Sequence, residues 1–432
     1  MKIIQIVPGF GGTFYCGNCL RDSALVQSLR RQGHDALTIP MYLPLTLNSE
    51  TQTDGIPVFY GAVNLYLKQN YPWLRNMPRF VERLLNSGPI LRIAAHKAGS
   101  TRAEGLEEMT ESMLLGSEGN QRKELEELVD FLRKEQPDIV HLSNALLLGL
   151  ARQIREEIKV PVICSLQDED VWVDAMHESY RERIWNLMAE RGKDVDAFVA
   201  VSHFYAGVMQ QRMKIPDEKI HVVHIGLNPA SYEPSPPATD PPAIGFLSRM
   251  NEENGFGLLI DAFIELKRNE RFAPLRLYAT GGMTGDDKVF IRRQVQKLKR
   301  AKLEDLVEIQ DEYHPDSLRE FFRKISLLSV PVLKGEAFGL YQLEALASGV
   351  PLVQPAIGAF PEIIEATGGG VVYQPNTSSA LAIKLAEVLD SNTQLIEMSI
   401  KGIETVSSKF DCRSLTGKMV DIYQLILEDH RK

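Results

Sequence analysis

Two glutamates eight residues apart are the clearest candidates for chemistry in this sequence. Glu336 lies in a glycine-bordered turn, and Glu344 lies inside the helix predicted to follow it. A carboxylate on such a turn can hold sugar hydroxyls or stabilise a developing positive charge, and one on the helix can accept hydrogen bonds from a ribose diol. Taken as isolated residues, both would be better explained as solvated charges near a helix N-terminus, where a negative charge is favourable.

The backbone of the same turn is suited to an anion. Gly335 and Gly339 allow close approach of the chain, and we expect Phe338, Gly339 and Leu340 to present backbone N–H groups at the helix start. Because a helix N-terminus carries partial positive charge, the turn predicts a site for a phosphate or a similar group.

A second glycine cluster follows the N-terminal apolar run. Gly9, Gly11 and Gly12 approach the dinucleotide fingerprint G-x-G-x-x-G, but Phe14 stands at the last glycine position. The next predicted strand also lacks the acidic residue that would bind a ribose, so NAD or FAD binding is disfavoured. An anion at the helix start and a tight turn without a ligand remain equal alternatives.

Cys16 and Cys19 form a C-x-x-C pair in the same loop. A structural zinc site needs four ligands, normally from two such pairs, and the sequence has no second pair. A redox centre at a helix start is an alternative, but nothing around the pair indicates redox chemistry. We therefore interpret the two cysteines as small thiols that pack in a loop.

Short apolar runs alternate with amphipathic stretches and supply the elements that position these residues. This alternation is typical of parallel sheets with helices on both faces. The predicted strands of the first half are 2–8, 35–42, 137–144, 160–167, 195–202 and 219–226. Those of the second half are 243–248, 275–280, 307–310, 325–332, 350–355 and 369–374.

A proline-rich stretch separates the two series of strands and predicts a stiff linker. We expect an N-terminal domain at 1–227, the linker at 228–243, a second domain at 244–410, and a C-terminal helix at 411–432 that packs back on the first domain. The predicted fold class is α/β, with two doubly wound, Rossmann-like domains facing a cleft.

Composition excludes several other classes of protein. The formal net charge of −9 disfavours a nucleic-acid surface, and four cysteines in 432 residues do not make a disulfide framework. The N-terminal apolar run is too short for a signal peptide, and no run has membrane-spanning length. We therefore expect a cytoplasmic protein, which leaves peripheral contact with a membrane open.

The segment "EAFGLYQLEALASGVP", continued by "GAFPEII", resembles the E-x7-E signature of retaining glycosyltransferases of family 4, the glycogen-synthase-like group. The resemblance extends over most of the chain. "IGFLSRMNEENGFGLLIDAF" is similar to the G-R-L-x-x-x-K-G segment of that family, with Arg249 on the arginine and Asn254 at the lysine position. "PDIVHLSN" and "AVSHFYAGVM" also look like family elements, but Ser143 and Gln167 stand where histidines are common.

The resemblance implies the GT-B fold and a sugar transfer in a cleft between the domains. Glu336 would bind the donor sugar near its anomeric carbon, Glu344 would hold the ribose, and Arg249 would neutralise the leaving diphosphate. It implies a donor site that comprises Gly11, Gly12, Arg249, Asn254, Phe338, Gly339, Leu340 and Glu344. The nucleobase would lie near Tyr278 or the segment 310–314.

On the acceptor side, the resemblance places His141 beside the reaction as a second catalytic residue, with Asn144, Tyr60 and Asp168 near the acceptor. The leaving phosphate would itself deprotonate the acceptor hydroxyl. Asp168-Glu-Asp170 could be a D-x-D metal site, but the GT-B fold needs no metal, so we expect a cleft-lining or capping carboxylate cluster.

The expected donor is a UDP-, GDP- or ADP-linked sugar, which is a co-substrate, and neither a metal nor another cofactor is expected. The acceptor is open among a glycan, a lipid and a small molecule, and no nucleic-acid partner is expected. Two alternatives remain. Because Asn254, Ser143 and Gln167 depart from the family pattern, the protein could bind a sugar or nucleotide without transferring it. The second alternative is a phosphorylase-like sugar-phosphate enzyme, whose ligand has one phosphate instead of two and would need only a single arginine.

Overall fold

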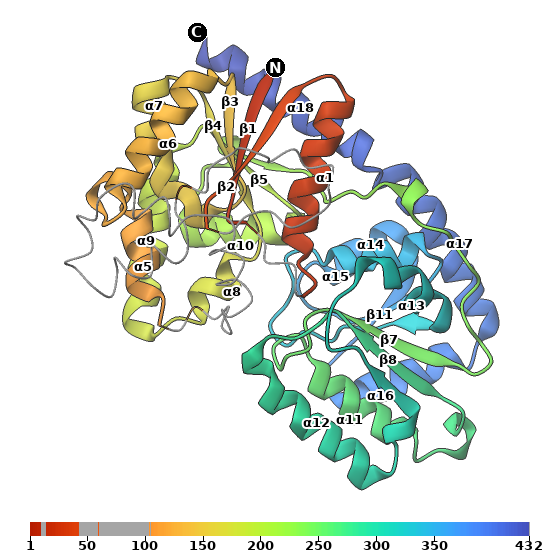
Figure 1. The fold of residues 1–432 in the computed structure, drawn as a ribbon. Coiled ribbons are helices and arrows are strands. Elements are labelled where there is room, and N and C mark those ends of the chain that lie inside the picture. The colour runs from red at the N-terminus through yellow and green to blue at the C-terminus, as the bar shows by residue number, and fades with distance from the viewer. Residues whose placement is uncertain (10–13, 43–58, 60–102, 104, 432) are drawn as a thin grey trace. The chain divides into compact units, whose positions relative to one another are not determined.

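The computed structural model describes residues 1–9, 14–42, 59, 103 and 105–431, which divide into two compact α/β units (Figure 1). The first unit contains the described residues of Met1–Gly11, Asn18–His224 and Leu415–Lys432. The second contains the described residues of Gly12–Gly17 and Ile225–Ser414. The proline-rich stretch 228–243 and residues 14–17 of the first loop therefore lie with the second unit.

The first unit is built on a parallel sheet with the strand order β2-β1-β3-β4-β5-β6. Most of these strands are short apolar runs, as expected for strands covered on both faces. They are β1 Lys2–Val7, β2 Asp35–Pro40, β3 Ile139–Leu142, β4 Val162–Leu166, β5 Ala197–Ala200 and β6 Ile220–Val222. The register pairs Gln5 of β1 with His141 of β3, so two polar side chains lie side by side on one face of the sheet.

Helices pack on both faces of this sheet (Figure 1). They are α1 Gly17–Arg31, α5 Glu107–Leu114, α6 Arg122–Glu135, α7 Ala151–Ile158, α8 Glu169–Asp174, α9 Glu178–Arg191, α10 His203–Met213 and α18 Cys412–His430. Helix α7 is preceded directly by a 3-10 helix, Ala145–Leu150. Gly149 explains the tight packing there, because an added Cβ would lie 2.0 Å from the carbonyl oxygen of Met113.

The second unit contains a second parallel sheet, with the strand order β12-β11-β10-β7-β8-β9. Its strands are β7 Ala243–Leu247, β8 Arg276–Thr280, β9 Val307–Ile309, β10 Leu327–Leu328, β11 Leu352–Pro355 and β12 Gly370–Tyr373. Strand β10 is much shorter than the predicted 325–332. After Leu328 the chain leaves the ladder, and the backbone N–H of Val330 donates to the Gln354 side chain at 2.9 Å.

Helices also flank both faces of the second sheet (Figure 1). They are α11 Phe256–Leu266, α12 Lys288–Ala301, α13 Leu318–Lys324, α14 Leu340–Ala347, α15 Phe360–Thr367, α16 Ser378–Leu389 and α17 Asn392–Lys409. Helix α11 packs against both α12 and α16 and forms one layer with them. Across the described helices of the chain, none is both long and apolar enough to cross a membrane.

Candidate active site

Glu336 is held on the turn before α14 by a second segment, Ile357–Glu362. The backbone carbonyl oxygen of Glu336 accepts a hydrogen bond from the backbone N–H of Ala359 at 2.9 Å. Gly358, at a φ of 62°, packs so closely that an added Cβ would lie 2.4 Å from the backbone nitrogen of Glu336. The half-buried Glu336 carboxylate accepts a hydrogen bond from the Tyr341 hydroxyl at 3.1 Å. The "EAFG" and "GAFPEII" segments therefore form one structural element.

The start of α14 is fixed by a glycine and a buried aromatic ring. Gly339 precedes the helix at a φ of 77°, a left-handed conformation that favours glycine. The buried Phe338 ring packs 6.5 Å from the ring of Phe410, and its carbonyl accepts a hydrogen bond from the Gln342 side chain at 2.6 Å. Phe338, Gly339 and Leu340 thus lie together at the helix start, with the Phe338 side chain in the core.

Glu344 is buried, and two tyrosines from distant parts of the sequence satisfy its carboxylate. Tyr15 donates its hydroxyl to one oxygen at 2.6 Å, and Tyr232 donates to the other at 3.0 Å. Burial raises the pKa of Glu344, and the two hydrogen bonds only partly offset this effect. Tyr313 packs edge-on against Tyr15, with ring centroids 5.4 Å apart. Together these residues form a tyrosine cage around Glu344.

Arg249 follows β7 and is paired with a carboxylate of the same unit. Its guanidinium donates to Asp287 at 2.8 and 3.1 Å, and to the Thr284 hydroxyl at 2.8 Å. Burial alone would raise the pKa of Asp287, but the hydrogen bonds from Arg249 and Thr284 outweigh it and lower that pKa. The pair fixes the direction of the guanidinium and partly neutralises its charge.

Asn254 holds the loop between β7 and α11. Its side-chain amide donates to the Ser248 hydroxyl at 2.9 Å and to the Arg249 carbonyl at 3.0 Å. Its backbone N–H donates to the Asn251 side chain at 2.8 Å. The polar groups of Asn254 are thus used within the loop that carries Arg249, where the family pattern would have a lysine.

Residues Phe14–Gly17, which we call the loop tip, contact three of the predicted donor-binding residues. The Phe14 ring lies 5.8 Å from the Arg249 guanidinium. Tyr15 reaches Glu344, and an added Cβ at Gly17 would lie 3.5 Å from the Cβ of Leu340. Cys16 in this segment and Cys19 in α1 form no disulfide within the part of the chain that the structure describes. Gly11 and Gly12, which precede the loop tip, and Tyr60 lie outside the described residues.

A buried polar layer lies on the face of the first sheet that α1 and α18 cover (Figure 1). Arg21 donates to the Gln167 side chain and to the Ser165 hydroxyl, each at 2.6 Å. Asp22 accepts a hydrogen bond from Gln5 at 3.0 Å and lies 3.5 Å from the Arg21 guanidinium. Burial raises the pKa of Asp22 to about 6, although its neighbours favour the charged form.

His141 lies within this polar layer and has no exposed surface. Its Nδ1 is 2.6 Å from the Tyr423 hydroxyl of α18, and its Nε2 is 2.8 Å from the Ser165 hydroxyl. Burial and the nearby Arg21 charge lower the pKa of His141 to about 3. The imidazole is therefore neutral at physiological pH, and this geometry favours a positioning role over direct contact with a substrate.

Glu169 ties together the loops that follow β3 and β4. Its carboxylate accepts hydrogen bonds from the backbone N–H groups of Ala145 and Gln167 at 2.8 and 2.7 Å, and from the Tyr205 hydroxyl at 2.8 Å. Burial raises the pKa of Glu169 to about 7, which the three hydrogen bonds counteract. The central residue of the D-E-D sequence is therefore a buried cap rather than a surface group.

The two predicted acceptor-side residues within the described range are fixed by these loops. Asn144 caps the 3-10 helix by accepting from the Leu146 N–H at 3.1 Å. Asp168 has a φ of 58° and accepts a hydrogen bond from the Asn18 side chain at 3.0 Å. A non-glycine residue in the left-handed region is uncommon and is often found near functional sites.

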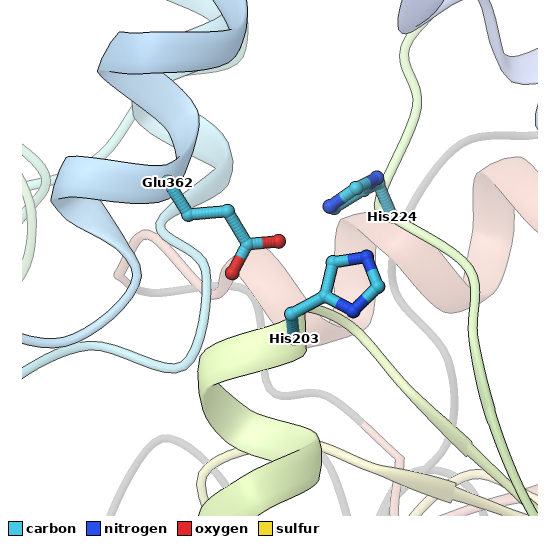
Figure 2. Close-up of side chains that lie close together, drawn as sticks. All are labelled: His203, His224 and Glu362. Atoms are coloured by element: carbon cyan, nitrogen blue, oxygen red, sulfur yellow. The ribbon is translucent and has the colours of Figure 1, made fainter.

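Two histidines of the first unit lie side by side (Figure 2). His203 is in the first turn of α10 and His224 follows β6, with ring centroids 5.8 Å apart and planes at 71°. Glu362, also labelled in Figure 2, belongs to α15 of the second unit. By themselves, two imidazoles offer fewer ligands than the three or four protein ligands of a zinc site, so the pair alone does not define a metal centre.

Of the three tyrosines at the Glu344 cage, two were not among the site residues predicted from the sequence. Tyr15 and Tyr232 stand in the first loop and in the proline-rich stretch, and neither has a spacing that signals contact with Glu344. Tyr313 does fall within the segment 310–314 considered for the nucleobase. Tyr278 instead lines a different pocket of the second unit, together with Glu308, Gln310 and Lys324.

Comparisons with known proteins agree with the motifs and the fold. Residues 113–231 match the family described as "Glycosyltransferase Family 4", and residues 241–391 match "Glycosyl transferases group 1". The chain is 25% identical over 230 residues to the lipopolysaccharide core biosynthesis mannosyltransferase LpsB of Rhizobium meliloti, covering 51% of this chain and 60% of that protein. It is 30% identical over 139 residues to the D-inositol 3-phosphate glycosyltransferase of Streptomyces griseus, covering 32% and 29%.

Solved structures resemble this chain over nearly its whole length. The sucrose-phosphate synthase of Thermosynechococcus elongatus superposes with a TM-score of 0.73 at 16% identity, covering 99% of this chain and all of that one. HepE of Anabaena, solved in complex with UDP, gives 0.70 at 15% identity, covering 98% and 100%. The predicted α/β fold class, GT-B, is confirmed. The chain belongs to the group 1, family 4 glycosyltransferases.

Proposed function

We propose that this chain transfers a sugar from a nucleoside-diphosphate donor to an acceptor hydroxyl, with retention of the anomeric configuration. The observation that carries the proposal is the geometry of the E-x7-E turn. Glu336 and Glu344 stand at the two ends of one rigid element, which the Ala359–Glu336 hydrogen bond and the start of α14 hold in place. The matched families and the UDP complex of HepE support a nucleotide-sugar donor.

In this proposal each group of the second unit acts on a different part of the donor. Glu336 contacts the sugar and stabilises the positive charge that develops at the anomeric carbon. Glu344 accepts hydrogen bonds from the ribose. Arg249 and the N-terminal end of α14 stabilise the negative charge on the departing diphosphate. The departing phosphate oxygen takes the proton of the acceptor hydroxyl, so no side chain has to act as the base.

The first unit is proposed to present the acceptor. Asn144 and Asp168 stand on the loops that Glu169 ties together. The Gln167 side chain accepts a hydrogen bond from Arg21 at 2.6 Å and donates one to the Ser143 carbonyl at 2.7 Å. His141, buried behind these loops, orients them through Ser165. The acceptor class is open among glycans, lipids and small molecules.

Ligand binding and turnover together test this proposal. Thermal unfolding is measured with UDP, GDP, ADP and inorganic phosphate, and a panel of UDP-, GDP- and ADP-sugars is screened for hydrolysis or transfer. A ligand present at 100 times its Kd stabilises the folded state by about 2.7 kcal/mol, a readily measured shift. We expect one nucleoside diphosphate to stabilise the protein and its sugar conjugate to be consumed. The product's anomeric configuration, read by NMR, should match that of the donor.

A second candidate function is binding of the nucleotide or sugar without transfer of the sugar. Asp287 partly neutralises Arg249, and Asn254 is uncharged and hydrogen-bonded to Ser248 where the family pattern has a lysine. A diphosphate would therefore meet less positive charge here than in the family pattern. A protein that only binds the nucleotide or sugar would show stabilisation by a nucleoside diphosphate without turnover of any donor in the panel. A response to phosphate alone would instead favour a phosphorylase-like enzyme and contradict the proposed transfer.

A further inference from the structure

The loop tip lies against the residues to which the proposed function assigns the donor. The backbone N–H of Tyr15 donates to the Gly281 carbonyl at 2.8 Å, at the end of β8. Its ring contacts those of Tyr313 and Tyr341, with centroids 5.4 and 6.3 Å away. Tyr15 is 6% exposed, although its chain neighbours Phe14 and Cys16 are only half-buried. Its side chain is thus inserted into the second unit.

The two hydroxyls on Glu344 supply the same set of donors that a ribose diol would. A carboxylate has two oxygens, and each accepts one phenol hydrogen here, from Tyr15 at 2.6 Å and from Tyr232 at 3.0 Å. Burial and the negative charge of Glu344 raise the pKa values of both phenols, so both stay protonated and able to donate. Each carboxylate oxygen could accept a second hydrogen bond, but Glu344 is only 3% exposed. A ribose can therefore reach this carboxylate only where one of the two tyrosine side chains gives way.

The two tyrosines differ in how firmly their backbones are held. Tyr232 belongs to the proline-rich stretch, where the N–H groups of Ser235 and Ala238 donate to the carbonyls of Ser348 and Ile325 at 3.1 and 3.2 Å. Gly349 packs against this stretch so closely that an added Cβ would lie 2.4 Å from the Ser235 carbonyl oxygen. In the loop tip, the backbone of Tyr15 is joined to Gly281 by one hydrogen bond at 2.8 Å, and the contacts of its ring with Tyr313 and Tyr341 hold the side chain rather than the backbone.

We propose that the Tyr15 hydroxyl competes with the donor ribose for Glu344, so that the loop tip is an exchangeable cover of the donor site. This inference rests on the proposed function, because it takes Glu344 as the ribose ligand. In the empty protein Tyr15 keeps a buried carboxylate satisfied, which would otherwise be costly. When the donor binds, a ribose hydroxyl replaces the phenol, and Tyr232 stays in place.

Phenylalanine at each position removes one hydroxyl and keeps the ring, which makes Tyr15→Phe and Tyr232→Phe a matched pair. Calorimetric titrations use UDP, GDP and ADP, each compared with its 2′,3′-dideoxy analogue. We expect Tyr15→Phe to bind the preferred ribonucleotide about three- to tenfold more tightly than the unaltered protein does, because a charge-assisted competitor is gone. Its affinity for the dideoxy analogue should change little. Tyr232→Phe should not tighten binding of either ligand.

The outcomes separate the two proposals. If the unaltered protein binds a ribonucleotide and Tyr15→Phe binds it no more tightly, the competition is wrong and the proposed function stands. Equal tightening of ribo- and dideoxynucleotide would also contradict competition for Glu344, because the gain would not depend on the ribose diol. If neither protein binds any of the three nucleotides, the proposed function fails and the inference fails with it. Thermal unfolding of both variants shows whether each remains folded.

Discussion

Glu169 in the first unit and Glu344 in the second are both buried carboxylates that join distant parts of the chain, yet their partners differ in kind. Glu169 accepts hydrogen bonds from two backbone N–H groups and one tyrosine hydroxyl. Glu344 accepts from two tyrosine hydroxyls. The exposed fractions, 1% and 3%, do not separate them. A backbone N–H can only donate and is fixed by the fold, whereas a hydroxyl can rotate, accept or be replaced.

The comparison teaches that burial alone does not distinguish a structural carboxylate from one that binds a ligand. Glu169 has the partners of a permanent cap, because its removal would leave two buried N–H groups without an acceptor. Glu344 has partners whose place another pair of hydroxyls can take. Glu336 completes the contrast, since its carboxylate is half-buried on the turn before α14.

Among these three carboxylates, we expect the largest effect on turnover from replacing Glu336, which is half-buried. Glu336→Ala should lower turnover of the nucleotide-sugar donor by about a thousandfold, because charge stabilisation at the anomeric carbon is lost. The change removes the hydrogen bond from Tyr341 and keeps the backbone hydrogen bond between Ala359 and the carbonyl of residue 336, so the unfolding midpoint should move little. Steady-state kinetics and thermal unfolding of the same preparation measure both quantities. Glu365→Ala, which removes an exposed carboxylate of α15, is the matched control. Full activity of Glu336→Ala would refute the role given to this residue.

The paired variants Glu169→Gln and Glu344→Gln test the comparison directly. In Glu169→Gln an amide nitrogen would face a backbone N–H, so we expect the unfolding free energy to fall by about 2–3 kcal/mol. In Glu344→Gln the Tyr15 or Tyr232 hydroxyl can rotate to accept from the new amide, and the loss should be below about 1 kcal/mol. The order should be reversed for nucleotide affinity, which should fall more in Glu344→Gln than in Glu169→Gln.

Denaturant unfolding and calorimetric titration of the two variants provide these values. Equal losses of stability would show that the difference between backbone and hydroxyl partners has no energetic consequence. A fall in nucleotide affinity in Glu169→Gln alone would reverse the assignment of the two carboxylates.

The buried His141 predicts that the stability of the first unit depends on pH. Burial lowers the pKa of His141 to about 3, below its ordinary value of 6.5. Its contribution to stability is therefore fully present above pH 6.5 and is lost, by about 1.4 kcal/mol per pH unit, as the pH falls from 6.5 towards 3. The raised pKa values of Asp22 and Glu169 act in the opposite direction, because ionising them on raising the pH lowers stability.

Comparison with His141→Gln isolates the histidine from these carboxylates. The unfolding free energies of both proteins are measured from pH 7.5 to 5.0. The difference between them should shrink as the pH falls below 6.5, by about 1.4 kcal/mol per unit. A difference that stays constant over this range would mean that His141 has the same pKa in the folded and unfolded protein, and would contradict the lowered pKa.

The fold was largely predictable from the sequence, because its strands are short apolar runs and the sheets are parallel. The E-x7-E turn was predictable for a similar reason, since Gly335, Gly339 and Gly358 mark backbone positions with positive φ near two carboxylates. The strand predicted from the sequence at 325–332 is longer than the observed β10. Apolar residues continue through Val332, and composition does not show that the ladder ends at Leu328.

The tyrosine cage around Glu344 could not be predicted, because it depends on contacts between remote parts of the chain. Tyr15 and Glu344 are 329 positions apart, and Tyr232 stands in a stretch that composition identifies as a linker. The resemblance assigned His141 to catalysis, but the hydrogen bonds that bury it involve Tyr423, 282 positions away. Local patterns specify the backbone of a site, whereas the partners of its side chains come from tertiary packing.

The smallest expected effect concerns the loop that carries Arg249. Asn254→Lys restores the basic residue of the family pattern and should tighten nucleoside-diphosphate binding about three- to tenfold at low ionic strength. It gives up the Asn254 hydrogen bonds to Ser248 and Arg249, so the unfolding free energy should fall by about 1 kcal/mol.

Asn254→Ala loses the same two bonds without adding charge and is the matched control. Titrations of both variants at low and high salt separate the two effects, because a gain from charge is screened by salt and a change in loop geometry is not. Tighter binding by both variants would mean that Asn254 restrains the loop. Tighter, salt-sensitive binding by the lysine variant alone would mean that the donor site of this chain lacks one cation. The second unit would then bind a diphosphate through Arg249 and the start of α14, with Asp287 setting how much of the Arg249 charge the ligand meets.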